Sequence, residues 1–150
     1  MHGLSQTFPA ARYFAFIDDI VDVTADIAVS SGVEMLASRL GDRSDLMRAD
    51  GHSDYGHSFC AFLDRWPGIL TDRSIVLVLG DGRNNNRSPE EQCFATIARR
   101  AQTVYWLNPE GQENWTSGDS AIPRYRSFCD AIVECRNLTQ LQRFVAKLAS

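Results

Sequence analysis

One acidic residue stands where an aliphatic stretch of the chain stops. Ile75–Leu79 are five consecutive aliphatic residues, and Gly80, Asp81 and Gly82 follow them directly. The run is too short to span a membrane and lacks apolar/polar alternation, so it predicts a central parallel strand covered on both faces. Ligands of open α/β sheets collect beyond the carboxyl ends of such strands, where glycines allow close turns. Asp81 is therefore the first candidate for a functional carboxylate.

The other candidate side chains in the sequence give weaker evidence for a metal site or a catalytic site. His52 and His57 have no cysteine or third ligand nearby, which argues against zinc. Asp18 and Asp19 are expected in a hairpin turn. A small Mg-dependent hydrolase or phosphotransfer enzyme using Asp81, or Asp18 with Asp19, is the alternative function. No nucleophile–base pair and no glycine-rich phosphate cradle supports that enzyme.

Strand and helix patterns alternate along the chain, as in doubly wound α/β sheets. The predicted strands are 12–17, 20–24, 74–79, 103–107 and 131–135, the first two forming an antiparallel hairpin. The predicted helices cover about 33–40, 59–66, 88–100, 125–129 and 137–148. Ser88 is expected to cap the helix at 88–100, and Asn137 the helix at 137–148. Leu138 and Leu141 are placed on the inward face of the last helix, and Leu77 is expected to be fully buried.

The length and composition of the chain fit one globular domain, 1–150. Its residues are 44% hydrophobic and 23% charged. A net charge of -4 with a pI near 5.3 argues against nucleic acid as a partner. Lys147 is the single lysine, which excludes a Walker-type phosphate loop. No apolar run near 20 residues and no signal peptide is found, so we expect no membrane contact and a cytoplasmic location.

The four cysteines are widely spaced and form no C-x-x-C pair. Each of Cys60, Cys93, Cys129 and Cys135 lies among apolar neighbours. We therefore expect buried free thiols.

Three loops taken together resemble a von Willebrand factor type A (VWA) domain. They are Gly-His-Ser-Asp-Tyr-Gly at 51–56, Leu-Gly-Asp-Gly at 79–82 and Trp-Leu-Asn-Pro at 106–109. Within that superfamily the sequence is most similar to the CoxE-like bacterial branch. Members of this branch show a leucine-asparagine-proline strand end, then a tryptophan and a Thr/Ser-Gly-Asp-Ser loop, which match 107–109, Trp115 and 117–120 here.

The resemblance implies a metal-ion-dependent adhesion site for Mg²⁺ or Mn²⁺ at the carboxyl edge of the sheet. By position, Ser53 would supply a hydroxyl ligand and Asp81 a carboxylate. A hard divalent cation prefers such oxygen ligands and leaves a position for a partner's carboxylate. The remaining residues that the resemblance places on the interaction loops are Asp54, Gly82, Asn108, Trp115, Asp119 and Ser120.

The first and most diagnostic VWA loop, Asp-x-Ser-x-Ser, has no match in this chain. The chain is therefore interpreted as a VWA domain truncated at its N-terminus. The missing strand would lie in mid-sheet between 12–17 and 74–79, and three metal ligands would be missing with it. We expect a degenerate metal site that is weak or vacant, and self-association through the exposed sheet edge.

The predicted fold is a three-layer, doubly wound, mostly parallel α/β sheet of the VWA/Rossmann-like kind with one antiparallel edge strand. By resemblance the strand order is 20–24, 12–17, a vacant or closed position, 74–79, 103–107 and 131–135. The implied function is a non-catalytic adaptor. It would work with a MoxR-type AAA+ ATPase, or with a client enzyme, in the maturation of a metalloenzyme such as carbon monoxide dehydrogenase.

Overall fold

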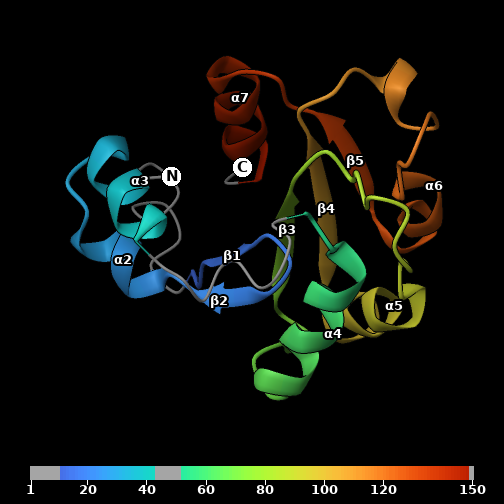
Figure 1. Cartoon of the computed structure of the whole chain (residues 1–150), viewed down its shortest axis with the longest axis horizontal. Coiled ribbons are helices and arrows are strands. Elements are labelled where there is room, and N and C mark those ends of the chain that lie inside the picture. Colours follow the sequence, from blue (N-terminus) through green and yellow to red (C-terminus); the bar gives the residue numbers. More distant parts are fainter. Residues whose placement is uncertain (1–10, 43–51, 149–150) are drawn as a thin grey trace.

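The strands form two separate sheets with helices around them (Figure 1). The computed structural model describes residues 11–42 and 52–148, with Val33 described by its backbone alone. The strands are β1 (Phe14–Phe16), β2 (Ile20–Asp22), β3 (Ile75–Leu79), β4 (Thr103–Asn108) and β5 (Ala131–Glu134). β1 and β2 form an antiparallel hairpin, and β3, β4 and β5 form a parallel sheet in that order. The α/β class, the hairpin and the order of the parallel strands are confirmed.

Helices lie on both faces of the parallel sheet. α4, α5 and α6 supply residues to the same buried cluster as β3 and β4, and α7 packs on the opposite face. The α2–α3 pair lies beside the hairpin (Figure 1). The α-helices are α2 (Thr24–Val29), α3 (Val33–Gly41), α4 (Tyr55–Arg65), α5 (Glu91–Arg100), α6 (Ile122–Tyr125) and α7 (Leu138–Leu148). Two short 3-10 helices are η2 (Gln112–Asn114) and η3 (Arg126–Phe128).

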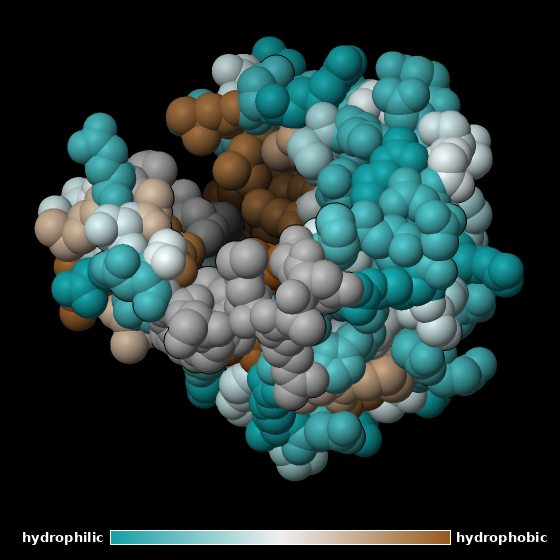
Figure 2. Space-filling view, viewed as in Figure 1, coloured by the Kyte–Doolittle hydropathy of each residue, from teal (hydrophilic) through white to brown (hydrophobic). Residues whose placement is uncertain are grey.

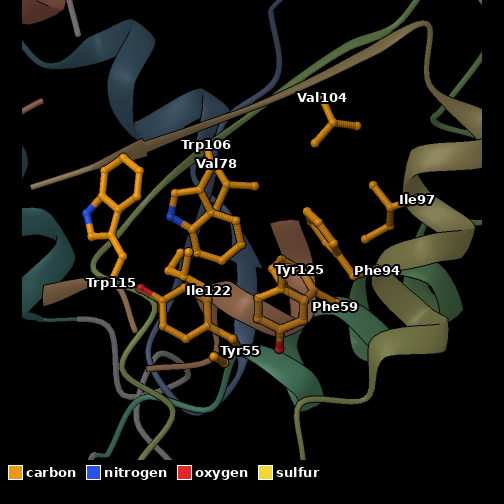
Figure 3. Close-up of a cluster of buried hydrophobic side chains, with 11 residues drawn as sticks. Tyr55, Phe59, Val78, Phe94, Ile97, Val104, Trp106, Trp115, Ile122 and Tyr125 are labelled. Atoms are coloured by element: carbon orange, nitrogen blue, oxygen red, sulfur yellow. The ribbon is translucent and has the colours of Figure 1, made fainter. Parts of the chain in front are cut away.

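An aromatic cluster forms the core on the α4–α5–α6 face (Figure 3). Trp106 of β4 is fully buried and stacks on Tyr125 with their ring centroids 5.4 Å apart. Phe59 and Phe94 complete the cluster, with their centroids 4.6 Å apart. Alternate residues of a strand face opposite sides, so Val104 joins Trp106 in this core. The aromatic rings thereby join α4, α5 and α6 to β4.

β3 is less buried than the sequence predicts, and the prediction of a strand covered on both faces is wrong within the described residues. Ile75 is 48% exposed and Leu79 46% exposed, while Leu77 is half-buried rather than fully buried. Among the described residues β3 pairs with β4 alone, and α7 packs on β4 through Phe144 and Tyr105 on the face that Ile75, Leu77 and Leu79 share. Val78 faces the aromatic core, whereas its odd-numbered neighbours face the other side.

Three local predictions are also wrong. A helix, α2, follows β2 where a strand to residue 24 was expected, because Val23 and Ile27 bury together. Ser88 does not cap α5; the cap position is Glu90, with φ 43°. Leu138 is 66% exposed rather than inward-facing, whereas Asn137 caps α7 as predicted by accepting from the Gln140 N–H at 3.0 Å.

Two of the four cysteines are not free thiols. Cys60 of α4 and Cys93 of α5 form a disulfide with their Cα atoms 5.1 Å apart. They are 33 residues apart in sequence, so only the packing of α4 on α5 brings them together. Cys129 and Cys135 are free, and burial raises the pKa of Cys129 to about 12.

Within residues 11–42 and 52–148, no helix combines the length and apolar character that a membrane crossing requires.

The disulfide predicts a thiol count that can be measured directly. Denatured, unreduced protein should titrate two thiols per chain, because two of the four cysteines are free. Reduction should lower the free energy of unfolding by about 2–4 kcal/mol, since the bond closes a loop of intermediate length. A Cys60→Ser/Cys93→Ser variant is the control and should be insensitive to reductant. Four titratable thiols without reductant would contradict the assignment.

Candidate functional site

The ends of β3 and β4 are tied together by a buried amide. Asn108, the last residue of β4, has no exposed surface. Its Nδ2 donates to the backbone O of Asp81 at 2.9 Å, and its Oδ1 accepts from the backbone N of Glu110 at 2.8 Å. One side chain therefore fixes both the loop after β3 and the loop after β4.

Tyr55, the first residue of α4, holds the turn after β3. Its hydroxyl donates to Asp81 Oδ1 at 3.1 Å and accepts from the backbone N of Gly82 at 3.1 Å. Burial raises the pKa of Tyr55 above its usual value, so the hydroxyl keeps its proton in the physiological range. The glycines are required here: a Cβ on Gly80 would lie 2.1 Å from the Tyr55 hydroxyl, and Gly82 has φ +78°.

The loop before α4 is joined to the loop after β3. Asp54 caps α4 by accepting from the His57 N at 2.9 Å and pairs with Arg87 at 3.3 Å. The buried Asn84 Oδ1 accepts from the backbone N of Tyr55 at 2.7 Å. Ser53 contributes its backbone O, which accepts from Asn85 at 3.0 Å. These contacts hold the N-terminus of α4 against residues 83–87.

Arg83 connects the loop after β3 to the loop after β4. Its guanidinium makes two hydrogen bonds to the Glu110 carboxylate, at 3.1 and 2.6 Å, and lies 3.4 Å from Asp119. It also donates to the backbone O of Ser117 at 2.5 Å. Hydrogen bonds to Glu110, and then the charge of that carboxylate, raise the pKa of Arg83. Two hydrogen bonds from one guanidinium to one carboxylate fix the relative orientation of the two groups as well as their distance.

The loop at 110–120 is also packed from within. Trp115 is buried and donates from Nε1 to the backbone O of Glu110 at 3.0 Å. Ser120 donates from its hydroxyl to the backbone O of Trp115 at 2.8 Å. Asp119 accepts from the backbone N of Asn85 at 2.9 Å. The loop therefore has a defined shape at this end of the sheet.

We call the residues joined by these bonds the loop network. It brings together the predicted residues Asp54, Asp81, Gly82, Asn108, Trp115, Asp119 and Ser120, and it touches Ser53 through its backbone. Tyr55, Arg83 and Asn84 were missed by sequence reasoning. Their places in the sequence could have identified them, because Arg83 and Asn84 directly follow the glycine turn and Tyr55 directly follows the helix cap.

The carboxylates near the ends of β3 and β4 already have protein partners. Asp81 Oδ1 already accepts from the Tyr55 hydroxyl and from the Arg83 backbone N, and Asp54 and Asp119 are held by their own partners. No group of three or more His, Cys, Asp or Glu residues placed to hold a metal occurs in the part of the chain that the structure describes. A hard divalent cation needs about six oxygen ligands.

Comparison with known families gives one match over almost the whole chain. The family described as VWA domain containing CoxE-like protein matches residues 1–144. No curated protein and no solved structure matches.

Tyr55→Phe should destabilise the chain through the loop network. The change removes one hydroxyl and leaves the Gly82 N–H without its acceptor, which costs about 1–3 kcal/mol. Tyr105→Phe is the matched control, since the Tyr105 ring packs on Phe144 with centroids 5.3 Å apart and keeps that contact. Urea unfolding monitored by circular dichroism measures both variants. Equal stability of Tyr55→Phe and the parent would show that the tyrosine hydroxyl does not hold the turn.

Proposed function

This chain belongs to the family of VWA domain containing CoxE-like proteins, and from that premise we propose that it is a non-catalytic adaptor that binds protein partners. The observation that supports the proposal most is the loop network. Its polar side chains bond to one another across three loops, so they shape a surface rather than present a set of free reactive groups. A surface fixed before binding loses less conformational entropy when a partner docks.

The partner we propose is a MoxR-type AAA+ ATPase, with a client metalloenzyme of the carbon monoxide dehydrogenase kind. The exposed residues of the 110–120 loop, including Glu113 and Thr116, are the contact surface in this proposal. We also propose a cytoplasmic location. In that compartment thiols are kept reduced, so Cys60 and Cys93 would exchange between the thiol and disulfide forms with the redox state of the cell.

We propose further that the chain by itself holds Mg²⁺ or Mn²⁺ weakly. Titration calorimetry of the purified chain should give no site tighter than roughly 10 µM, which corresponds to about 7 kcal/mol of binding free energy. The physical reason is that two oxygen ligands leave most of the coordination shell to water. A tighter site that Asp81→Asn abolishes would contradict this prediction.

The adaptor proposal predicts that loop-surface changes weaken partner binding without unfolding the chain. A Glu113→Arg/Thr116→Arg variant should bind an immobilised MoxR-type AAA+ ATPase at least tenfold more weakly than the parent. A Glu34→Arg/Ala37→Arg variant is the matched control, because it makes the same kind of change at exposed positions on α3. Biolayer interferometry measures the dissociation constants, and melting temperatures check the fold.

Two outcomes would overturn the adaptor proposal. One is an equal loss of binding in both double variants, which would make the effect one of net charge. The other is turnover of generic phosphate or ester substrates that Asp81→Asn abolishes, since an adaptor has no such activity.

A further inference from the structure

The segment that leads from the loop network into α5 has an uncommon backbone conformation. Glu90, the residue before α5, has φ 43° and ψ 50°, in the left-handed region. Side chains with a Cβ are disfavoured in this region, and asparagine tolerates it better than glutamate does. Asn85 and Asn86 of the same segment also have positive φ, at 51° and 57°. Glu90 is therefore held in its conformation by the contacts around it.

The sequence favours a different start for α5. Ser-Pro-Glu-Glu at 88–91 has a serine for the cap and a proline for the first helical position. In a helix that starts there, the Ser88 hydroxyl accepts from the Glu91 N–H, and the Ser88 backbone O accepts from the Gln92 N–H. In the structure the helix starts at Glu91, and Ser88 O accepts from Asn84 Nδ2 at 3.2 Å. The two starts therefore compete for the Ser88 backbone O.

Contacts with α4 favour the observed start. Gly56 of α4 lies so close to the segment that a Cβ at this position would be 2.2 Å from Ser88 O. The buried Asn84 side chain, which donates to Ser88 O, also accepts from the Tyr55 N–H at 2.7 Å. The start of the segment is therefore fitted against the first turn of α4.

The disulfide joins the other end of the segment to α4. Cys93 is the third residue of α5, and its N–H donates to the backbone O of Glu90 at 2.9 Å. Its sulfur is bonded to Cys60, which lies one turn after Gly56 on α4, beside α5 (Figure 1). Residues 84–90 are therefore held to α4 by hydrogen bonds at their start and by a covalent bond just after their end.

The outer side of the segment is polar. The exposed residues of this stretch are Asn85, Asn86, Ser88 and Glu90. Figure 2 shows mostly hydrophilic residues on the side of the molecule where Figure 1 places the chain from β3 to α5. A rearrangement of this segment therefore exposes little additional apolar surface. The balance between the two starts depends on hydrogen bonds, on the conformation of Glu90 and on the link to α4.

We propose that Cys60 and Cys93 form a redox switch that selects where α5 begins. With the disulfide formed, α5 starts as observed and the contacts of Asn84 are kept. With the two thiols reduced, α5 extends back to a Ser88 cap, Glu90 leaves the left-handed region, and Asn84 no longer bonds Ser88 O. Extension changes the path of the segment where it touches α4, so the first turn of α5 must move relative to α4, and the disulfide opposes that movement. Reduction thereby loosens the loop network at its contact with α4.

The switch is a two-electron thiol–disulfide exchange with a low-molecular-weight disulfide. One cysteine thiolate attacks that disulfide, forms a mixed disulfide and releases one small thiol. The second cysteine thiolate then displaces the other small thiol, so the two cysteines are oxidised and the small disulfide is reduced to two thiols. A dithiol reductant reverses the exchange by supplying two electrons and two protons. Cys60 and Cys93 are both partly exposed, which gives small thiols access to the bond.

The inference concerns the chain alone. Its test needs no partner protein, so failure of the adaptor proposal would leave it standing.

The test is amide hydrogen exchange of the whole 150-residue chain, measured by NMR in the oxidised state and after reduction with dithiothreitol. The first N–H groups of a helix have no intrahelical acceptor, so the Gln92 N–H gains one when α5 extends. Reduction should slow exchange at Gln92 at least tenfold. It should speed exchange at Tyr55 at least tenfold, because the Tyr55 N–H loses a fixed acceptor in Asn84. Reoxidation with oxidised glutathione should restore both rates.

Two pairs of cysteine variants assign the effect. Cys60→Ser/Cys93→Ser should show the exchange pattern of the reduced chain with or without reductant. Cys129→Ser/Cys135→Ser is the matched control, because it removes the two free thiols and keeps the disulfide. It should respond to reductant as the parent does.

Two variants of the segment test the change of helix start. Ser88→Ala removes the cap of the extended helix and should leave less than a threefold slowing at Gln92 on reduction. Glu90→Gly should have the same effect, because glycine adopts the left-handed region without strain and so favours the observed start.

Four results would overturn the proposal. One is equal exchange at Gln92 and at Tyr55 in the two redox states. Another is faster exchange at all amides on reduction, including unfolding of the reduced chain, which would make the disulfide a general stabiliser. The third is full slowing at Gln92 in Ser88→Ala. The fourth is no response in Cys129→Ser/Cys135→Ser, which would assign the effect to those two cysteines.

Discussion

The hydroxyl of Tyr55 is the contact on which the carboxyl end of the sheet depends. It binds the Asp81 carboxylate and the Gly82 N–H at once, so it sets the direction in which the chain leaves β3. The positions of the later residues of the loop network depend on that direction. Arg83 can reach Glu110 and Asp119 only because the turn places its backbone beside the 110–120 loop. The glycines on either side of Asp81 are needed so that the turn fits beneath Tyr55 and Ile122.

Tyr55 also links the polar loops to the apolar core. Its ring lies 5.4 Å from that of Trp106, and its hydroxyl is in the loop network, so burial of the ring positions the polar contacts. The core in turn depends on the disulfide-linked pair α4 and α5, which hold Phe59 and Phe94 against Trp106. The packing of the aromatic core beneath the loops therefore determines the surface at the strand ends. This coupling is why single substitutions in the core are expected to be felt at the loops.

The resemblance to VWA domains predicted the order of the parallel strands and the residues of the interaction loops, while the hydrophobic run and the glycine turn predicted that β3 ends before Asp81. The sequence did not predict that Asn108 and Trp115 point inward, since the same side chains can bond within a loop or across an interface. Ser88 is not the cap because α5 begins three residues later, at Glu91, after Glu90 with φ 43°. The Cys60–Cys93 bond could not be read from spacing alone, because it requires the relative rotation of two helices.

The exposure of β3 shows what an aliphatic run does and does not specify. Five aliphatic residues specify that the strand needs cover on both faces, but not which segment supplies that cover. In the described chain, α4 and α5 cover the Val78 side, and the Ile75–Leu79 side is only partly covered. Among the described residues, the exposed apolar side chains of β3 therefore belong to a strand that pairs on one edge only. One strand thus carries a polar, internally bonded surface at its carboxyl end and partly exposed apolar side chains along its length.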